Sequence, residues 1–166
     1  MIKKIIIALL VAMPMSMMAQ KFGKVDVENV LTAMPEYTQV QTQLQDASSK
    51  FQAELDKLQE EFNKKYGEFQ ELLKDTATPE SIKERRMQEI QELDNKIQQF
   101  RNSAAQDLQR QQQQLMAPVE QKFQDAIKAV GSEGNFTYIS ANGQFLFEGS
   151  NVEDVTALVK TKLGIK

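Results

Sequence analysis

The fold is decided by residues 40–73, which read VQTQLQDASSKFQAELDKLQEEFNKKYGEFQELL. Apolar residues recur there in alternating steps of four and three, so that Val40, Phe51, Phe62 and Leu73 are spaced eleven apart. This spacing places an apolar stripe along one face of an α-helix. An eleven-residue repeat corresponds to about 3.67 residues per turn, which favours nearly straight packing over a left-handed coil. The stretch therefore predicts one long, straight, amphipathic helix.

A second helix with the same rhythm follows the interruption Asp-Thr-Ala-Thr-Pro at residues 75–79. Thr78 is suited to be its N-cap and Pro79 to be its first helical residue. We therefore expect residues 35–130 to form an antiparallel helical hairpin, here called the arm, with its tip at 75–79. Gly67 and Pro118 interrupt the two helical patterns and are the candidate hinges of the arm.

Strand-like sequence is found only near the two ends of residues 20–166. Residues 136–148 contain two β-prone runs separated by Asn142-Gly143, the preferred pair for a type I′ turn, which predicts a β-hairpin with Tyr138 opposite Phe147. Ser150 with Glu153 resembles a capping box that would open a last helix.

An earlier strand is expected at 22–27, followed by a short helix capped by Asp26 or Asn29. The helical hairpin would bring this strand back to the β-hairpin, so residues 20–34 and 131–166 form a small body. The expected fold class is α+β and mostly helical, with the arm projecting from a small β-sheet body. Such a body is near the smallest size that sustains its own core, so oligomerisation is expected. The residues expected at the body and oligomer interface are Val25, Val27, Phe136, Tyr138, Phe145 and Phe147.

Residues 1–19 have the pattern of a secretory signal peptide. Lys3 and Lys4 precede an uncharged run over 5–18, and Ala19 provides a plausible cleavage point. The run is short for a membrane span of about 20 residues, although an uncleaved anchor is the alternative. The mature protein is therefore expected to be secreted to an oxidising compartment, where the lack of Cys avoids mispairing.

Composition excludes several classes of function. The chain has no Cys and no His, which removes disulfides, thiolate metal sites and the commonest general base. Its net charge is −3, without the clustered basic surface that nucleic acid requires. No Gly-rich phosphate-binding loop is present. We therefore expect no catalysis, no cofactor, no metal and no nucleic-acid partner.

Residues 24–37, KVDVENVLTAMPEY, resemble the opening of the Skp/OmpH-like family of periplasmic chaperones. Residues 136–148 and the Asp-Val helix after them resemble its closing segment. The resemblance implies a homotrimer in which three arms surround a cavity that holds unfolded outer-membrane proteins without ATP. A structural coiled-coil adaptor or tether of the cell envelope, without chaperone activity, is the alternative.

The surface that would hold a client is expected to be apolar. Residues 36–130 contain 13 Lys or Arg and 17 Asp or Glu, a net charge of −4, so charge attraction to acidic clients is weak. A slender arm of two helices leaves part of its aromatic side chains uncovered. The residues expected to contact clients are Phe51, Phe62, Phe69, Phe100 and Phe123. A basic cluster beside the tip consists of Lys83, Arg85 and Arg86. It is interpreted either as a contact site for a membrane or lipopolysaccharide, or as an ordinary solvated charged face.

Overall fold

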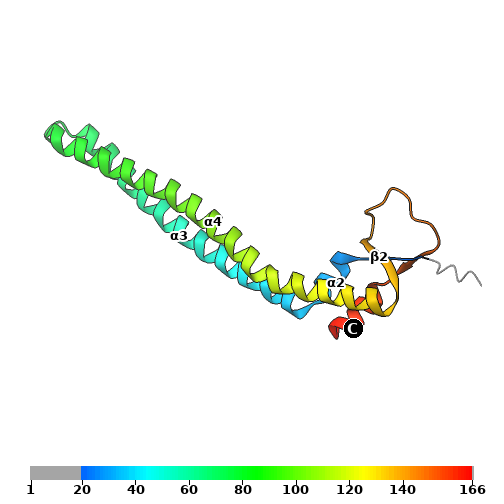
Figure 1. Cartoon of the computed structure of the whole chain (residues 1–166). Coiled ribbons are helices and arrows are strands. Elements are labelled where there is room, and N and C mark those ends of the chain that lie inside the picture. The colour runs from blue at the N-terminus through cyan, green and yellow to red at the C-terminus, as the bar shows by residue number, and fades with distance from the viewer. Residues whose placement is uncertain (1–19, 166) are drawn as a thin grey trace, which may run out of the picture.

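The computed structural model describes residues 20–165, so the expected signal peptide lies outside the described residues. The chain is mostly helical, and a long arm of two antiparallel helices extends from a small body (Figure 1). The elements in chain order are β1 (Lys21–Val25), α2 (Val27–Ala33), α3 (Pro35–Lys74), α4 (Glu80–Glu133), β2 (Phe136–Ala141), β3 (Val152–Asp154) and α5 (Thr156–Leu163).

The arm begins and turns close to where the sequence predicts. Pro35 lies in the first turn of α3, where its missing N–H costs no helical hydrogen bond. At the tip the predicted cap is displaced by one residue, because Pro79 rather than Thr78 is the N-cap of α4. The Thr78 hydroxyl instead donates to Asp75 Oδ2 at 2.7 Å, and Asp75 Oδ1 accepts from the Ala77 N–H at 2.9 Å. Asp75 therefore organises the turn.

The predicted β-hairpin is wrong. Only its first half is a strand, β2, and residues 142–151 form a loop that leads to β3. The sheet has the order β2-β1-β3, and both outer strands run parallel to β1. The chain therefore crosses over β1 instead of folding back on β2, so that both edges of β1 are paired.

The predicted capping box is wrong for the same reason. Val152, Glu153 and Asp154 pair with β1, and α5 begins only at Thr156. Asp154 accepts a hydrogen bond from the Thr156 N–H at 2.9 Å. The predicted strand 22–27 is likewise shorter, because Val27 begins α2. Asp26 caps that helix as expected, accepting from the Asn29 N–H at 3.0 Å.

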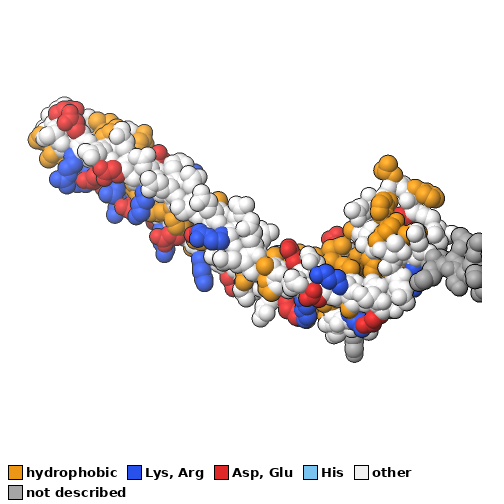
Figure 2. All heavy atoms as spheres, viewed as in Figure 1, with side chains coloured by type: hydrophobic (Ala, Val, Ile, Leu, Met, Phe, Trp, Pro, Cys, Tyr) orange, Lys and Arg blue, Asp and Glu red, His pale blue; other side chains and the backbone are white. Residues whose placement is uncertain are grey.

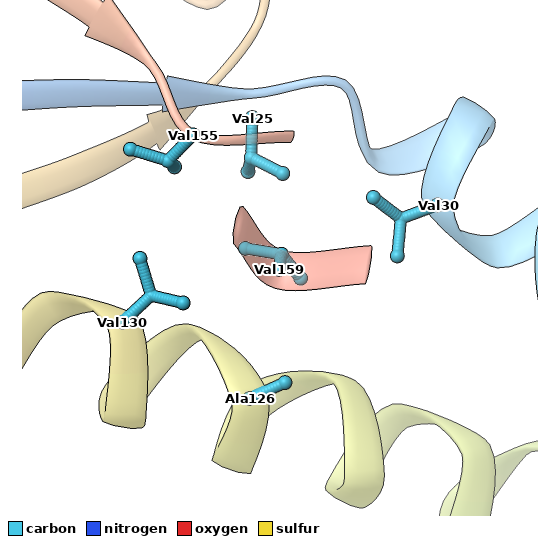
Figure 3. Packing of buried hydrophobic residues seen from close by; sticks show 6 residues of the cluster. All are labelled: Val25, Val30, Ala126, Val130, Val155 and Val159. Atoms are coloured by element: carbon cyan, nitrogen blue, oxygen red, sulfur yellow. The ribbon is translucent and has the colours of Figure 1, made fainter. Parts of the chain in front are cut away.

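The core of the body is built almost entirely from valine. One cluster joins β1, α2, the end of α4, the residue before α5, and α5 itself (Figure 3). Its buried members are Val25, Val30, Ala126, Val130, Val155 and Val159. A second buried group, Met34, Val40 and Val119, lies where the arm leaves the body. Phe123 packs against both groups and so connects the body to the root of the arm.

The middle of the arm has its own apolar core. Leu58 on α3 packs with Leu93 and Ile97 on α4, and all three are buried. This confirms the predicted use of the apolar stripe for packing the two helices together. The arm changes direction along the yellow part of α4, the stretch that contains Pro118 (Figure 1). Among residues 20–165, no helix is long and apolar enough to cross a membrane.

Candidate functional site

The five phenylalanines predicted to contact clients differ in how exposed their side chains are. Phe51 and Phe100 approach each other across the arm, with ring centroids 6.1 Å apart in an edge-to-face arrangement. Phe62 stacks on Tyr66 at 6.1 Å. The side chains of Phe51, Phe62, Phe100 and Phe123 are half-buried. Phe69 is only 4% exposed, which places it in the packing of the arm rather than on its surface.

The free end of the arm exposes more apolar surface than its middle. Four large apolar side chains there are 39–49% exposed, whereas Leu58 and Ile97 in the middle are 5% and 2% exposed. We call these four residues the distal set: Tyr66, Leu73, Ile82 and Met87. Figure 2 shows apolar side chains at this end of the arm and again on the loop that projects from the body.

Part of the distal set borders a hollow between the two helices. Leu73, Met87 and the edge of Phe69 supply its apolar lining, and Lys83 and Glu84 are among its polar lining residues. A hollow with an apolar floor and a charged rim can accept an apolar side chain of another chain. The sequence prediction included Tyr66 and Leu73 in the stripe but overlooked Ile82 and Met87. Met87 continues the α4 stripe three residues before Ile90, which was the available signal.

The predicted basic cluster is partly offset by two acidic neighbours, Glu80 and Glu89. Arg86 and Arg85 lie 2.8 Å and 3.2 Å from the Glu89 carboxylate, and Lys65 of α3 reaches the same group at 3.6 Å. The hydrogen bonds from Arg86 and then Arg85 hold the pKa of Glu89 below its usual value. Lys83 pairs with Glu80 at 3.9 Å. Three cations share the single Glu89 carboxylate, so part of the positive charge of the cluster is offset, and Arg85 stays 75% exposed.

The predicted interface residues of the body divide into two groups. Val25 is 2% exposed and belongs to the core of the protomer, and Val27 and Phe136 pack against that core. Tyr138 is 49% exposed and packs on Phe22 in a tilted arrangement, with ring centroids 4.8 Å apart.

The loop after β2 is the most exposed apolar segment of the body. Phe145, Leu146 and Phe147 are 47%, 111% and 85% exposed. The loop therefore presents an apolar surface that the protomer itself does not cover.

Acidic side chains are the candidate metal ligands of the described residues, because the chain has no His and no Cys. No group of three or more acidic side chains among residues 20–165 is arranged to hold a metal ion. The acidic side chains of the arm instead pair with Lys or Arg one turn away, as Glu71 does with Lys74 at 2.6 Å.

A family model described as outer membrane protein (OmpH-like) matches residues 21–163, which is nearly the whole described chain. The chain belongs to the OmpH-like family. Its long helices and small three-stranded sheet agree with the OmpH fold. Members of this family are periplasmic chaperones, not enzymes, and they bind unfolded outer-membrane proteins. No match to the chain was found among curated proteins.

Proposed function

We propose that this OmpH-like protein is an ATP-independent periplasmic holdase that encloses unfolded outer-membrane proteins between its arms and prevents their aggregation. The observation that carries the proposal is the exposure of the distal set at the free end of an arm whose middle is well packed. A helix pair that served only as a spacer would have no need of uncovered apolar side chains at its far end.

The grip is apolar and distributed. The distal set and the half-buried faces of Phe51, Phe62 and Phe100 each offer a small contact, while Phe69 supports them from inside the arm. Several weak contacts in one assembly act together, because each contact raises the effective concentration of the next. The client stays mobile and leaves when folding in the outer membrane is more favourable, so no nucleotide is needed.

The assembly that provides several arms is a homotrimer joined through the body. Two features of the protomer support self-association: β2 and β3 each have one unpaired edge, and the Phe145–Phe147 segment is exposed beside the sheet. Unpaired strand edges readily accept strands of another chain. The proposed number of protomers, three, is taken from the family resemblance.

The test compares aggregation of a urea-diluted outer-membrane β-barrel protein with and without the chaperone. We expect the variant Leu73→Ser/Ile82→Ser/Met87→Ser to need several-fold more protein than the wild type for equal suppression of light scattering. The control is Gln98→Ser/Gln99→Ser/Asn102→Ser, which changes exposed polar residues of α4 and should behave as wild type.

Two outcomes contradict the proposal. Unchanged suppression by the distal variant would remove the distal set from client binding. Absence of suppression by the wild-type protein would favour the structural adaptor or tether.

A further inference from the structure

The part of the arm nearest the body has a surface of a different kind. Two hollows there are lined largely by glutamine side chains, one of about 350 Å³ and one of about 450 Å³. The first is bordered by Gln41, Gln109, Gln112 and Gln113, together with Tyr37, Met116 and Glu120. The second is bordered by Gln43, Gln111 and Gln114, together with Asp46, Ala47, Lys50 and Leu115. We call these seven glutamines the amide set.

The two hollows lie on opposite flanks of the hairpin. Leu115 and Val119 of α4 face α3 and mark the packed side of the helix. With 3.6 residues per turn, Gln109 and Gln113 fall on one side of that line, and Gln111 and Gln114 fall on the other. Both flanks at the root of the arm therefore expose carboxamides.

The side chains of the amide set have no hydrogen-bond partner among residues 20–165. The same is true of Gln45, Gln70, Gln91, Gln98, Gln99 and Gln106, whereas four other glutamines of the arm are partnered. Those four glutamines each donate to the residue four positions ahead: Gln52 to Asp56 at 2.7 Å, Gln59 to Asn63 at 3.4 Å, Gln88 to Glu92 at 2.9 Å and Gln121 to Asp125 at 2.9 Å. In the amide set the positions four ahead of residues 111–114 are Leu115, Met116, Ala117 and Pro118, which carry no acceptor in their side chains.

Charge is also scarce in this part of the arm. Within residues 102–119 the charged side chains are Asp107 and Arg110, and they pair with each other. Figure 2 shows much of the arm between its charged tip and the body in white, the colour of uncharged polar side chains and backbone. The α4 side of the hollows therefore presents mainly neutral donors and acceptors. The charged residues of their lining are Asp46 and Lys50 of α3 and Glu120 near the body.

We propose that the amide set binds the main chain of the unfolded client. A carboxamide carries two N–H donors and a carbonyl acceptor, so it can satisfy both polar groups of a peptide unit. Every residue except proline offers the same pair of groups, and recognition is therefore independent of client sequence. This inference rests on the proposed function and adds to it: the distal set holds apolar side chains, and the amide set holds backbone.

Such a division suits a β-barrel client. Its strands alternate apolar and polar residues, and its unfolded backbone has no internal hydrogen bonds. Contacts between neutral amides are also little affected by ionic strength, in contrast to contacts between exposed charges.

The experiment uses full-length mature protein and a short uncharged peptide of Gly, Ser and Thr, together with the same peptide methylated on its backbone nitrogens. We expect the unmodified peptide to shift the side-chain amide NMR resonances of Gln109, Gln112 and Gln113, and the methylated peptide to shift them far less. The variant Gln109→Met/Gln112→Met/Gln113→Met keeps side-chain length and helix propensity but removes the hydrogen-bonding groups. It should bind the unmodified peptide at least about threefold more weakly.

The matched control is Gln52→Met/Gln59→Met/Gln121→Met, which replaces glutamines that already have partners and should leave peptide binding unchanged. Circular dichroism and mass in solution establish that both variants retain fold and assembly. Equal binding of the two peptides by the wild type, or equal binding of the unmodified peptide by the wild type and the Gln109 variant, would overturn this inference alone. The proposed function is judged separately, by the aggregation assay.

Discussion

Lys24 Nζ donates a hydrogen bond to Glu148 Oε2 at 2.7 Å, although the two residues are 124 positions apart. Their side chains are 29% and 17% exposed. The second oxygen of Glu148 is buried and has no hydrogen-bond partner among residues 20–165. The hydrogen bond to Glu148 and the charge of that carboxylate raise the pKa of Lys24. The pair ties the end of the loop 142–151 to the central strand β1, while Leu146 in the same loop stays exposed.

Removing this tie should free the loop without unfolding the body. In Glu148→Gln we expect amide hydrogen exchange over residues 145–152 to accelerate severalfold, because the charge-assisted bond from Lys24 is weakened. The matched control is Glu153→Gln, which neutralises a more exposed pair with Lys21 and should change exchange little. Equal exchange in Glu148→Gln and the wild type would show that the pair does not hold the loop.

The same pair predicts a response to alkaline pH. Because the folded-state pKa of Lys24 is raised above its usual 10.5, its contribution to stability is fully present below pH 10.5. The contribution is lost as the pH rises through the raised pKa. Exchange in the loop should therefore accelerate above pH 10.5 in the wild type beyond the intrinsic rate increase. Glu148→Gln should lack this additional step.

The exposed aromatic loop should govern assembly rather than protomer folding. In Leu146→Ser/Phe147→Ser we expect the helical circular dichroism to be retained, because neither side chain packs in the protomer core. Sedimentation or light scattering should show a shift toward the monomer as the protein is diluted. Thr137→Ser, a conservative change at an exposed position of β2, serves as the control. An unchanged mass at all concentrations would exclude the loop from the interface.

Acid should weaken the ion pairs that Glu89 makes with Arg86 and Arg85 on α4 near the tip. The pKa of Glu89 is held below its usual 4.5, first by Arg86 and then by Arg85. The contribution of this lowered pKa to stability is therefore present above pH 4.5 and is lost as the pH falls through the folded-state value. An NMR titration should show the pKa of Glu89 moving back toward 4.5 in Arg85→Met/Arg86→Met. An unmoved pKa would show that the two arginines do not set it.

The hinge prediction concerns Gly67 and Pro118. A methyl group at Gly67 would meet no atom within 4 Å, so Gly67→Ala should fit and stabilise α3 by about 1 kcal/mol. Pro118→Ala restores a helical N–H in α4. Together the two changes should stiffen the arm and narrow the range of client sizes that it protects from aggregation. The single variants Gly67→Ala and Pro118→Ala show which of the two positions causes the narrower client range. If the double variant protects small and large clients equally, neither residue acts as a hinge.

Prediction succeeded where the structure depends on local pattern. The stripe through Val40 and Leu58 predicts a helix because residues three and four apart share a helical face. Prediction failed for the exposure of Ile82 and Met87, because exposure depends on where the partner helix stops covering α4. It also failed for Phe69, whose burial comes from the other helix of the arm.

The sequence by itself determined the arm: two helices with a regular apolar period, broken by a turn that Asp75 stabilises, and a chain without His or Cys. Only the tertiary structure decided the body. Asn142-Gly143 and the flanking aromatic residues favour a hairpin, yet β2 and β3 both pair with β1, which is more than 110 residues away from β2. Helical hydrogen bonds join residues four apart and can be inferred from a short window of sequence. Strand pairing joins distant segments, so the pairing of β2 and β3 with β1 cannot be inferred from a short window of sequence.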